Sequence, residues 1–163
     1  MEEGEKMAVL AETIVQVLVS DDVILPLAAE KIDEIVASIR NLECFVIENK
    51  VVFQGILHKQ IFFVSTDSIV HHYGIDIPFS GFGDVPGVPA GMTCQLIPEI
   101  VFLDFKLVSP ELLRENVVID MGIIVLDMPS NVIEFTNTLP MRPLRFGKPG
   151  TVRVQGPNGG IPI

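Results

Sequence analysis

Two runs rich in Val, Ile and Phe, separated by a short polar break, constrain the fold more than any other feature of the sequence. The runs are Cys44–Ile47 and Val51–Val64, and Glu48-Asn49-Lys50 lies between them. β-branched and aromatic residues favour strands, and a polar break of this length is typical of a hairpin. The sequence therefore predicts two antiparallel strands. The first is extended back to about Glu34, although residues 31–42 also fit a helical period.

The residues that follow predict a third strand and then a long loop. Ser65–Ser68 provides turn-forming residues before Ile69–Tyr73, so the three strands form a meander. Residues 78–91 contain three prolines and four glycines, which disfavours a helix or a central strand and predicts an ordered loop. We expect its apolar side chains to pack on the body of the domain: Phe79, Phe82, Val85 and Val88.

Further runs predict strands on both sides of this meander. Cys94–Val108 and Val117–Leu126 are interpreted as a strand pair, with one helical turn within Ser109–Asn116 and the second strand placed centrally. Glu12–Val19 is interpreted as an N-terminal strand. The predicted fold class is all-β, an antiparallel β-sandwich or a partly open barrel with a hairpin meander and at most one short helical turn.

No arrangement of catalytic or metal-binding residues emerges from the sequence. If the second hairpin turns at Thr66-Asp67, His71 lies opposite Phe62 and its neighbour His72 lies opposite Ile61, which is an ordinary cross-strand arrangement. Adjacent histidines point to opposite faces of a strand and do not readily share a metal. Motifs of hydrolases, phosphate-binding loops and zinc proteases are also missing from the sequence. We therefore expect no enzyme, no cofactor and no metal.

Charge is distributed unevenly along the chain. Residues 1–136 hold seven basic and 21 acidic residues, a net charge of −14, whereas residues 137–163 have a net charge of +4 and no acidic residue. An acidic body argues against a nucleic-acid partner, because binding phosphates needs clustered Lys and Arg. The contrast between body and tail predicts charge-complementary docking, and either the same chain or a neighbouring one can accept the tail.

Cysteine content and the N-terminus bear on compartment. Cys44 and Cys94 are the only cysteines, and we expect two reduced, buried thiols. The N-terminus is acidic where a Sec signal is basic, and no apolar stretch reaches eighteen residues. We expect neither a Sec signal nor a membrane span.

Five sequence blocks resemble the SPOCS domain of spore-coat assembly proteins. The resemblance covers about Glu30 to Leu126, and the blocks occur in this order: Val51–Gly55, Lys59–Val64, Ile77–Ser80, Asp84–Gly87 and Pro89–Met92. It implies a β-rich scaffold module of endospore-forming bacteria without catalytic residues. Family members often carry repeated copies or a LysM domain that binds peptidoglycan, whereas this chain has one copy and no LysM segment.

The combined prediction is a structural protein of the spore coat or spore surface, made in the cytoplasm of the mother cell. It assembles as a homo-oligomer or fibre, with other spore-coat proteins as further partners; the alternative is an adaptor for a coat morphogenetic protein or cortex peptidoglycan. The expected divisions are an N-terminal strand or arm (1–29), a SPOCS-like domain (30–136) and a basic tail (137–163). Terminal strands can join β-domains by strand addition, so the expected contact residues are Ile14, Val15, Val17, Val19, Arg142, Arg145, Lys148, Val152, Arg153 and Val154.

Overall fold

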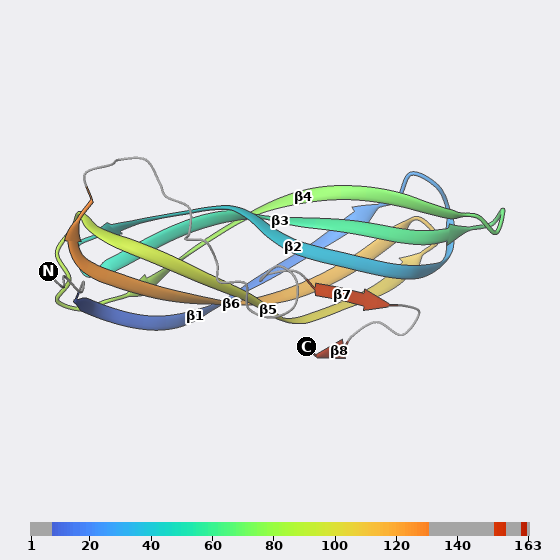
Figure 1. Cartoon of the computed structure of the whole chain (residues 1–163). Coiled ribbons are helices and arrows are strands. Elements are labelled where there is room, and N and C mark those ends of the chain that lie inside the picture. The colour runs from blue at the N-terminus through green and yellow to red at the C-terminus, as the bar shows by residue number, and fades with distance from the viewer. Residues whose placement is uncertain (1–7, 131–151, 156–160, 163) are drawn as a thin grey trace, which may run out of the picture.

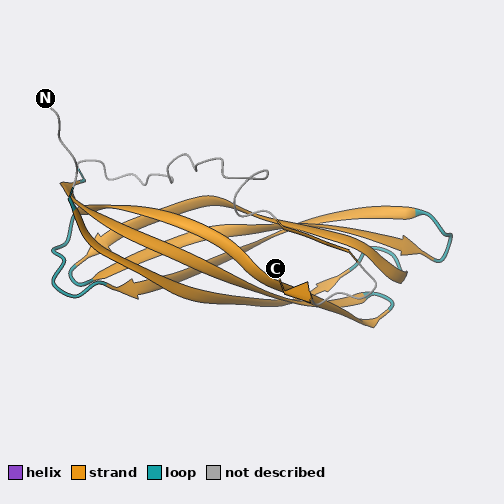
Figure 2. Cartoon of the chain, turned by 60° about the horizontal axis from the view of Figure 1, so that its bottom comes forward, coloured by secondary structure: helices purple, strands orange, loops and turns teal. Residues whose placement is uncertain are grey.

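The computed structural model describes residues 8–130, 152–155 and 161–162, and it is an elongated, all-β sandwich (Figures 1 and 2). Six long antiparallel strands make up the body: β1 (Val9–Ile24), β2 (Ala29–Ile47), β3 (Lys50–Ser65), β4 (Val70–Asp84), β5 (Met92–Ser109) and β6 (Leu112–Pro129). Two short strands follow, β7 (Val152–Gln155) and β8 (Ile161–Pro162). The predicted all-β class and its sandwich alternative are confirmed, and the strands do not close into a barrel.

The strands form two sheets with the orders β1-β6-β5-β8 and β4-β3-β2-β7. The second sheet is the predicted β2–β3–β4 meander, and β6 has its predicted central place between β1 and β5. β1 pairs with β6 along its length, from Val9 opposite Leu126 to Ile24 opposite Leu112. β7 pairs with β2, and β8 pairs with β5.

The core forms because alternate residues of both sheets face inward. On β3 the inward series runs through Val51, Phe53, Leu57, Ile61 and Phe63, all of them buried. It packs against inward residues of β6 such as Val117, Ile119, Met121 and Ile123. The period-two pattern in the sequence is thus the direct cause of the two-layer fold.

Glycines on β3 and β4 make room for aromatic rings. Gly81 lies opposite Phe53, and a Cβ on Gly81 would stand 2.6 Å from the end of that ring. Gly55 lies opposite Phe79, and a Cβ there would stand 2.9 Å from the Phe79 ring and 2.8 Å from Leu42. Real Cβ atoms do not approach so closely, so each ring occupies the space that a missing side chain leaves.

The predicted long loop over residues 78–91 was wrong in its first half. Residues up to Asp84 continue β4, and the loop covers residues 85–91. β4 is an edge strand, and an edge tolerates Pro78 because a proline there removes no ladder hydrogen bond. Of the apolar residues expected to pack down, Phe79, Val85 and Val88 are buried, whereas Phe82 is exposed.

Two further predictions were wrong, one about the link between β5 and β6 and one about the register of β3 and β4. The expected helical turn between β5 and β6 is a turn at Pro110-Glu111, whose carbonyl groups accept hydrogen bonds from the Ala29 and Leu25 amides. The His71 register was wrong by one residue, since His71 lies opposite Phe63 and His72 opposite Phe62.

The expectation of two reduced thiols was also wrong. Cys44 on β2 and Cys94 on β5 form a disulfide that joins the two sheets, with a Cα–Cα distance of 6.4 Å. The two cysteines are 50 residues apart in the sequence, so only the register of both sheets brings them together. The chain has no free cysteine.

Candidate interaction surfaces

β1 divides its side chains between the core and solvent. Of the contact residues predicted on it, Val15 and Val17 are half-buried and Val19 is buried, and all three face the core. Ile14 faces outward and is 67% exposed. The sequence prediction did not single out Leu18 and Ile24, which lie on the same outward face and are 64% and 74% exposed.

Both sheets have one long edge that carries no further strand in the described part of the chain. β1 pairs with β6 on one side, and β4 pairs with β3 on one side. An open edge offers unpaired backbone N–H and C=O groups to another polypeptide. These edges run for 16 and 15 residues, which is long for globular domains.

The predicted contact residues of the tail fall into two groups. Arg142, Arg145 and Lys148 lie outside the described residues. Val152, Arg153 and Val154 lie in β7, where they pair in register with Ala37, Val36 and Ile35 of β2. In the sheet β4-β3-β2-β7, β7 of the same chain therefore covers part of the β2 edge.

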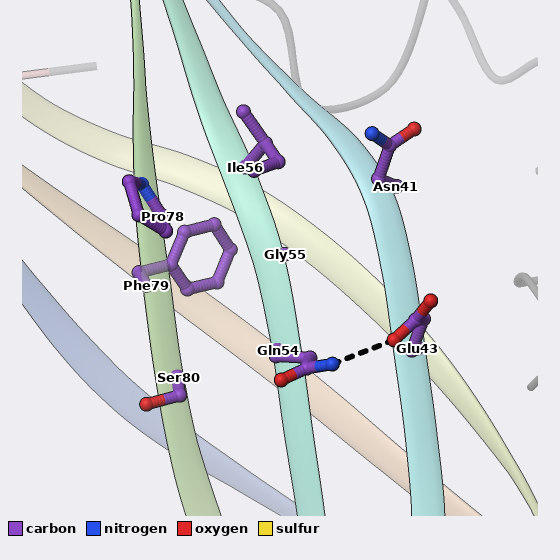
Figure 3. A pocket seen from close by; sticks show the side chains of 8 residues that line it. All are labelled: Asn41, Glu43, Gln54, Gly55, Ile56, Pro78, Phe79 and Ser80. Carbon is purple, nitrogen blue, oxygen red and sulfur yellow. Dashed lines mark hydrogen bonds between the residues drawn. The ribbon is translucent and has the colours of Figure 1, made fainter.

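A groove of about 460 Å³ lies on the outer side of the β4-β3-β2 sheet (Figure 3). It begins at a bulge of β2, where Asn41 has a φ of 54°, and there Gln54 donates a 2.6 Å hydrogen bond to Glu43. Amide, carboxylate and hydroxyl groups line it together with apolar atoms: Asn41, Glu43, Gln54, Gly55, Ile56, Pro78, Phe79 and Ser80. These groups are suited to hydrogen bonding a polar ligand.

A second groove of about 560 Å³ lies on the outer side of the β1-β6-β5 sheet. Gly122 forms its floor, opposite Ile14 on one neighbouring strand and Ile97 on the other. The remaining lining residues are Glu12, Thr13, Glu99, Asp120, Ile123 and Ile124. The groove thus combines aliphatic walls with three carboxylates.

A charged cluster lies inside the sandwich. Lys59 of β3 is fully buried, and its ammonium group donates to Asp21 Oδ1 at 2.6 Å and to Glu115 Oε1. Asp21 and Glu115 are cross-strand partners on β1 and β6, so one lysine of the opposite sheet holds two carboxylates. The second oxygen of each carboxylate is buried without a hydrogen-bond partner.

Burial dominates the ionisation of this cluster. Desolvation raises the pKa of Glu115 to about 7, while the charge and hydrogen bond of Lys59 act in the opposite direction and the charge of Asp21 adds to the rise. Glu115 therefore changes its charge near neutral pH. The sequence signals for this cluster were weak: a lysine on the inward register of an apolar strand and a glutamate at the end of another.

The three histidines have different polar partners, which are Asp76 for His58, Gln60 for His72 and Asp67 for His71. His58 Nδ1 forms a 2.6 Å hydrogen bond with Asp76, and Ser38 is the cross-strand partner of His58 on its other side. Residues 8–130 show no hydrogen bond between Ser38 and His58, which is the contact that activates a serine in a hydrolase triad. The same part of the chain contains no cluster of His, Cys, Asp and Glu residues suited to a metal ion.

The described residues define an all-β sandwich module whose accessible features are open grooves and strand edges. Within it, residues 28–108 match the family described as SipL, SPOCS domain, which confirms the resemblance found in the sequence. The matched segment spans β2 to β5, and β1 and β6 lie outside it. No curated protein and no solved structure matches the chain. No helix in the described segments has the length and apolarity needed to cross a membrane.

Proposed function

We propose that this protein is a non-catalytic structural component of the bacterial endospore coat or surface, which associates with copies of itself through strand edges and terminal segments. The SPOCS match indicates a sporulation-related, spore-associated role. The observation that supports self-association is the open β1 edge, whose outward side carries Ile14, Leu18 and Ile24 in largely exposed positions. An edge that is long, apolar and without a ladder partner favours pairing with another chain.

The disulfide supports a place outside the reducing cytoplasm. Disulfides persist in oxidising surroundings and are rare where thiols are kept reduced. After synthesis in the mother cell, the Cys44–Cys94 bond would form as the protein joins the spore envelope.

Association through β1 has two forms that share one surface. In edge pairing, β1 of each copy adds to a neighbour and keeps its own pairing with β6. In strand exchange, β1 of one copy replaces β1 of the next and forms the same ladder with β6. Deleting residues 1–20 is a poor test of either form, because it also removes buried Val19 and strips β6 of its partner.

A sharper experiment changes the outward face of β1 and leaves the core intact. The double variant Ile14→Lys/Leu18→Lys places two cations beside the open edge, which weakens pairing with another chain. Light scattering and negative-stain electron microscopy should show oligomers or fibres for the natural protein and smaller particles for the variant. Ile69→Lys/Val108→Lys, which changes exposed residues elsewhere by the same charge, serves as the control. A monodisperse monomer of the natural protein at all concentrations would rule the proposal out.

The adaptor alternative is favoured by the groove of Figure 3. Two exposed aromatic residues lie just beyond this groove, Phe45 two residues along β2 from Glu43 and Phe82 two residues along β4 from Ser80. Amide and hydroxyl groups next to aromatic rings are suited to glycan chains. Co-sedimentation of the natural protein with insoluble peptidoglycan tests this alternative. Loss of co-sedimentation in Gln54→Ala would support it, and an absence of binding by the natural protein would exclude it.

A further inference from the structure

The groove over Gly122 has walls and a floor that suit apolar side chains. Ile14 and Ile97 stand on the two sides of the glycine and are 67% and 49% exposed. A Cβ at position 122 would stand 3.3 Å from the Ile97 carbonyl oxygen, so the glycine keeps the floor low. Its volume of about 560 Å³ is enough to receive several side chains.

The rim of this groove has a negative charge that the described residues leave uncompensated. Glu99 lies directly opposite Asp120, and Glu12 lies one strand further on, opposite Ile124. Like charges on directly opposed residues destabilise a sheet. Within residues 8–130, no ion pair reaches these three carboxylates, and Asp120 accepts a 2.8 Å hydrogen bond from Gln16. A cationic segment of another polypeptide would relieve the repulsion.

The chain itself contains a segment of matching chemistry. Residues 141–148 read Met-Arg-Pro-Leu-Arg-Phe-Gly-Lys, in which cations alternate with apolar side chains. Pro143 has no N–H to give to a strand edge, so such a segment is better suited to binding a sheet face through its side chains. Its arginines match the carboxylates, and its Met, Leu and Phe match the aliphatic walls.

The reach of the chain argues that the segment comes from a neighbouring copy. Arg145 precedes Val152 by seven residues, which span at most about 24 Å when fully extended. Val152 pairs with Ala37, which is the partner of Lys59, so β7 lies at the level of the Lys59–Glu115 ion pair. Gly122 is seven residues along β6 from Glu115, about 23 Å away, and on the outer side of the opposite sheet, about 10 Å further across. Because these two legs are perpendicular, the straight-line separation is about 25 Å, so binding within one copy would require all seven linking residues to be fully extended. A tail from a neighbouring copy requires no such extension.

We propose that residues 141–148 of one copy bind the groove formed by Ile14, Glu99, Asp120 and Gly122 on the next copy. This inference rests on the proposed function and specifies the contact that the C-terminal segment makes in the assembly. Because tail and groove are different surfaces, the contact is heterologous, and a dimer held by a single contact has one free tail and one free groove. Repetition of the contact gives an open chain or a closed ring.

Neutralising either side tests the contact in the full-length protein. The groove variant is Glu99→Gln/Asp120→Asn, and the tail variant is Arg142→Gln/Arg145→Gln. Sedimentation velocity at low ionic strength should show an association constant lowered about tenfold for each, because two exposed ion pairs are lost. The matched control Glu111→Gln/Asp127→Asn removes two exposed carboxylates elsewhere and should assemble like the natural protein.

Mixing the two variants distinguishes this contact from general charge effects. The groove variant keeps a natural tail, and the tail variant keeps a natural groove. In an equimolar mixture, the tail of the first can therefore bind the groove of the second. We expect a discrete 1:1 dimer in the mixture where each variant alone is monomeric. Assembly of both variants at natural strength would overturn this inference and leave the proposed function intact, whereas a monomeric natural protein would overturn both.

A cross-linking measurement is independent of the assembly state. A photoreactive amino acid at position 97 should cross-link to residues 141–148, as identified by mass spectrometry. In a mixture of ¹⁴N-labelled and ¹⁵N-labelled protein, cross-linked peptides of mixed label show transfer between copies. Peptides of uniform label alone would place the tail on its own chain and contradict the proposal.

Discussion

Lys59 shows how one residue can tie two sheets together at a cost. A lysine without partners is strongly disfavoured in a core, and here two carboxylates of the opposite sheet compensate it. Two acids for one base leave an excess negative charge when all three are ionised. The proton that Glu115 takes up near neutral pH removes that excess.

Stability should therefore fall as the pH rises through neutrality. The folded protein keeps the Glu115 proton up to a pKa of about 7, whereas the unfolded chain releases it near 4.5. The contribution of this proton is complete below pH 4.5 and lost above pH 7, and it amounts to about 3 kcal/mol in the free energy of unfolding. Urea denaturation between pH 4.5 and 8 should show this loss in the natural protein and not in Glu115→Gln.

Two other carboxyl groups affect stability only at a lower pH than Glu115 does. A hydrogen bond from Arg114 lowers the pKa of Asp22, and a hydrogen bond from Ser65 lowers that of Asp67, so both affect stability below about pH 4. Glu111→Gln, at an exposed position, is the control for the loss of a carboxylate. Parallel pH curves for the natural protein and Glu115→Gln would refute this account of the cluster.

At the scale of strands, complementary sizes place β4 against β3. Phe53 fits over Gly81, and Phe79 fits over Gly55, so at these two positions a large residue on one strand meets a glycine on the other. Glycine weakens an isolated strand. Here the aromatic rings recover that loss by filling the vacant space.

Gly81→Ala should destabilise the protein by about 1–3 kcal/mol, because the new Cβ collides with the Phe53 ring. Phe53→Leu in the same chain shortens the opposing side chain and should restore part of the loss. Urea midpoints for the natural protein, both single variants and the double variant give the coupling free energy. Additive effects of the two changes would contradict direct contact between them.

Sequence periodicity predicted the strands well where tertiary context did not compete. Cys44–Val64 formed the expected hairpin because its polar break and its apolar alternation agree. Residues 78–84 were misassigned because proline and glycine favour loops locally, while their place at a sheet edge depends on distant strands. The core-facing Val15, Val17 and Val19 were candidates for contacts because their sequence pattern does not reveal which face meets the other sheet.

At the scale of the whole molecule, the Cys44–Cys94 bond fixes one end of the sandwich. It joins β2 to β5, strands that share no ladder hydrogen bonds. Sequence alone could not pair the two cysteines, because their distance follows from how the sheets pack. The groove over Gly122 could not be predicted from sequence either, since β1 contributes to its lining together with the β5–β6 hairpin, which lies far along the chain.

Removing the disulfide should lower the free energy of unfolding by about 4 kcal/mol, the loop entropy expected for cysteines 50 residues apart. Urea denaturation of Cys44→Ala/Cys94→Ala, or of the natural protein with reductant, measures this change. Reductant should have no effect on the double variant, which serves as the control. Equal midpoints for oxidised and reduced natural protein would show that the bond adds no stability.

The length of the strands affects how the molecule bears mechanical load. Ladder hydrogen bonds run perpendicular to the strands, so a pull along the long axis of the sandwich strains many of them together in shear. A pull across the sheet would instead separate them one after another, as a zipper opens. A protein built from strands of 15 to 19 residues therefore resists stretching most strongly along its length.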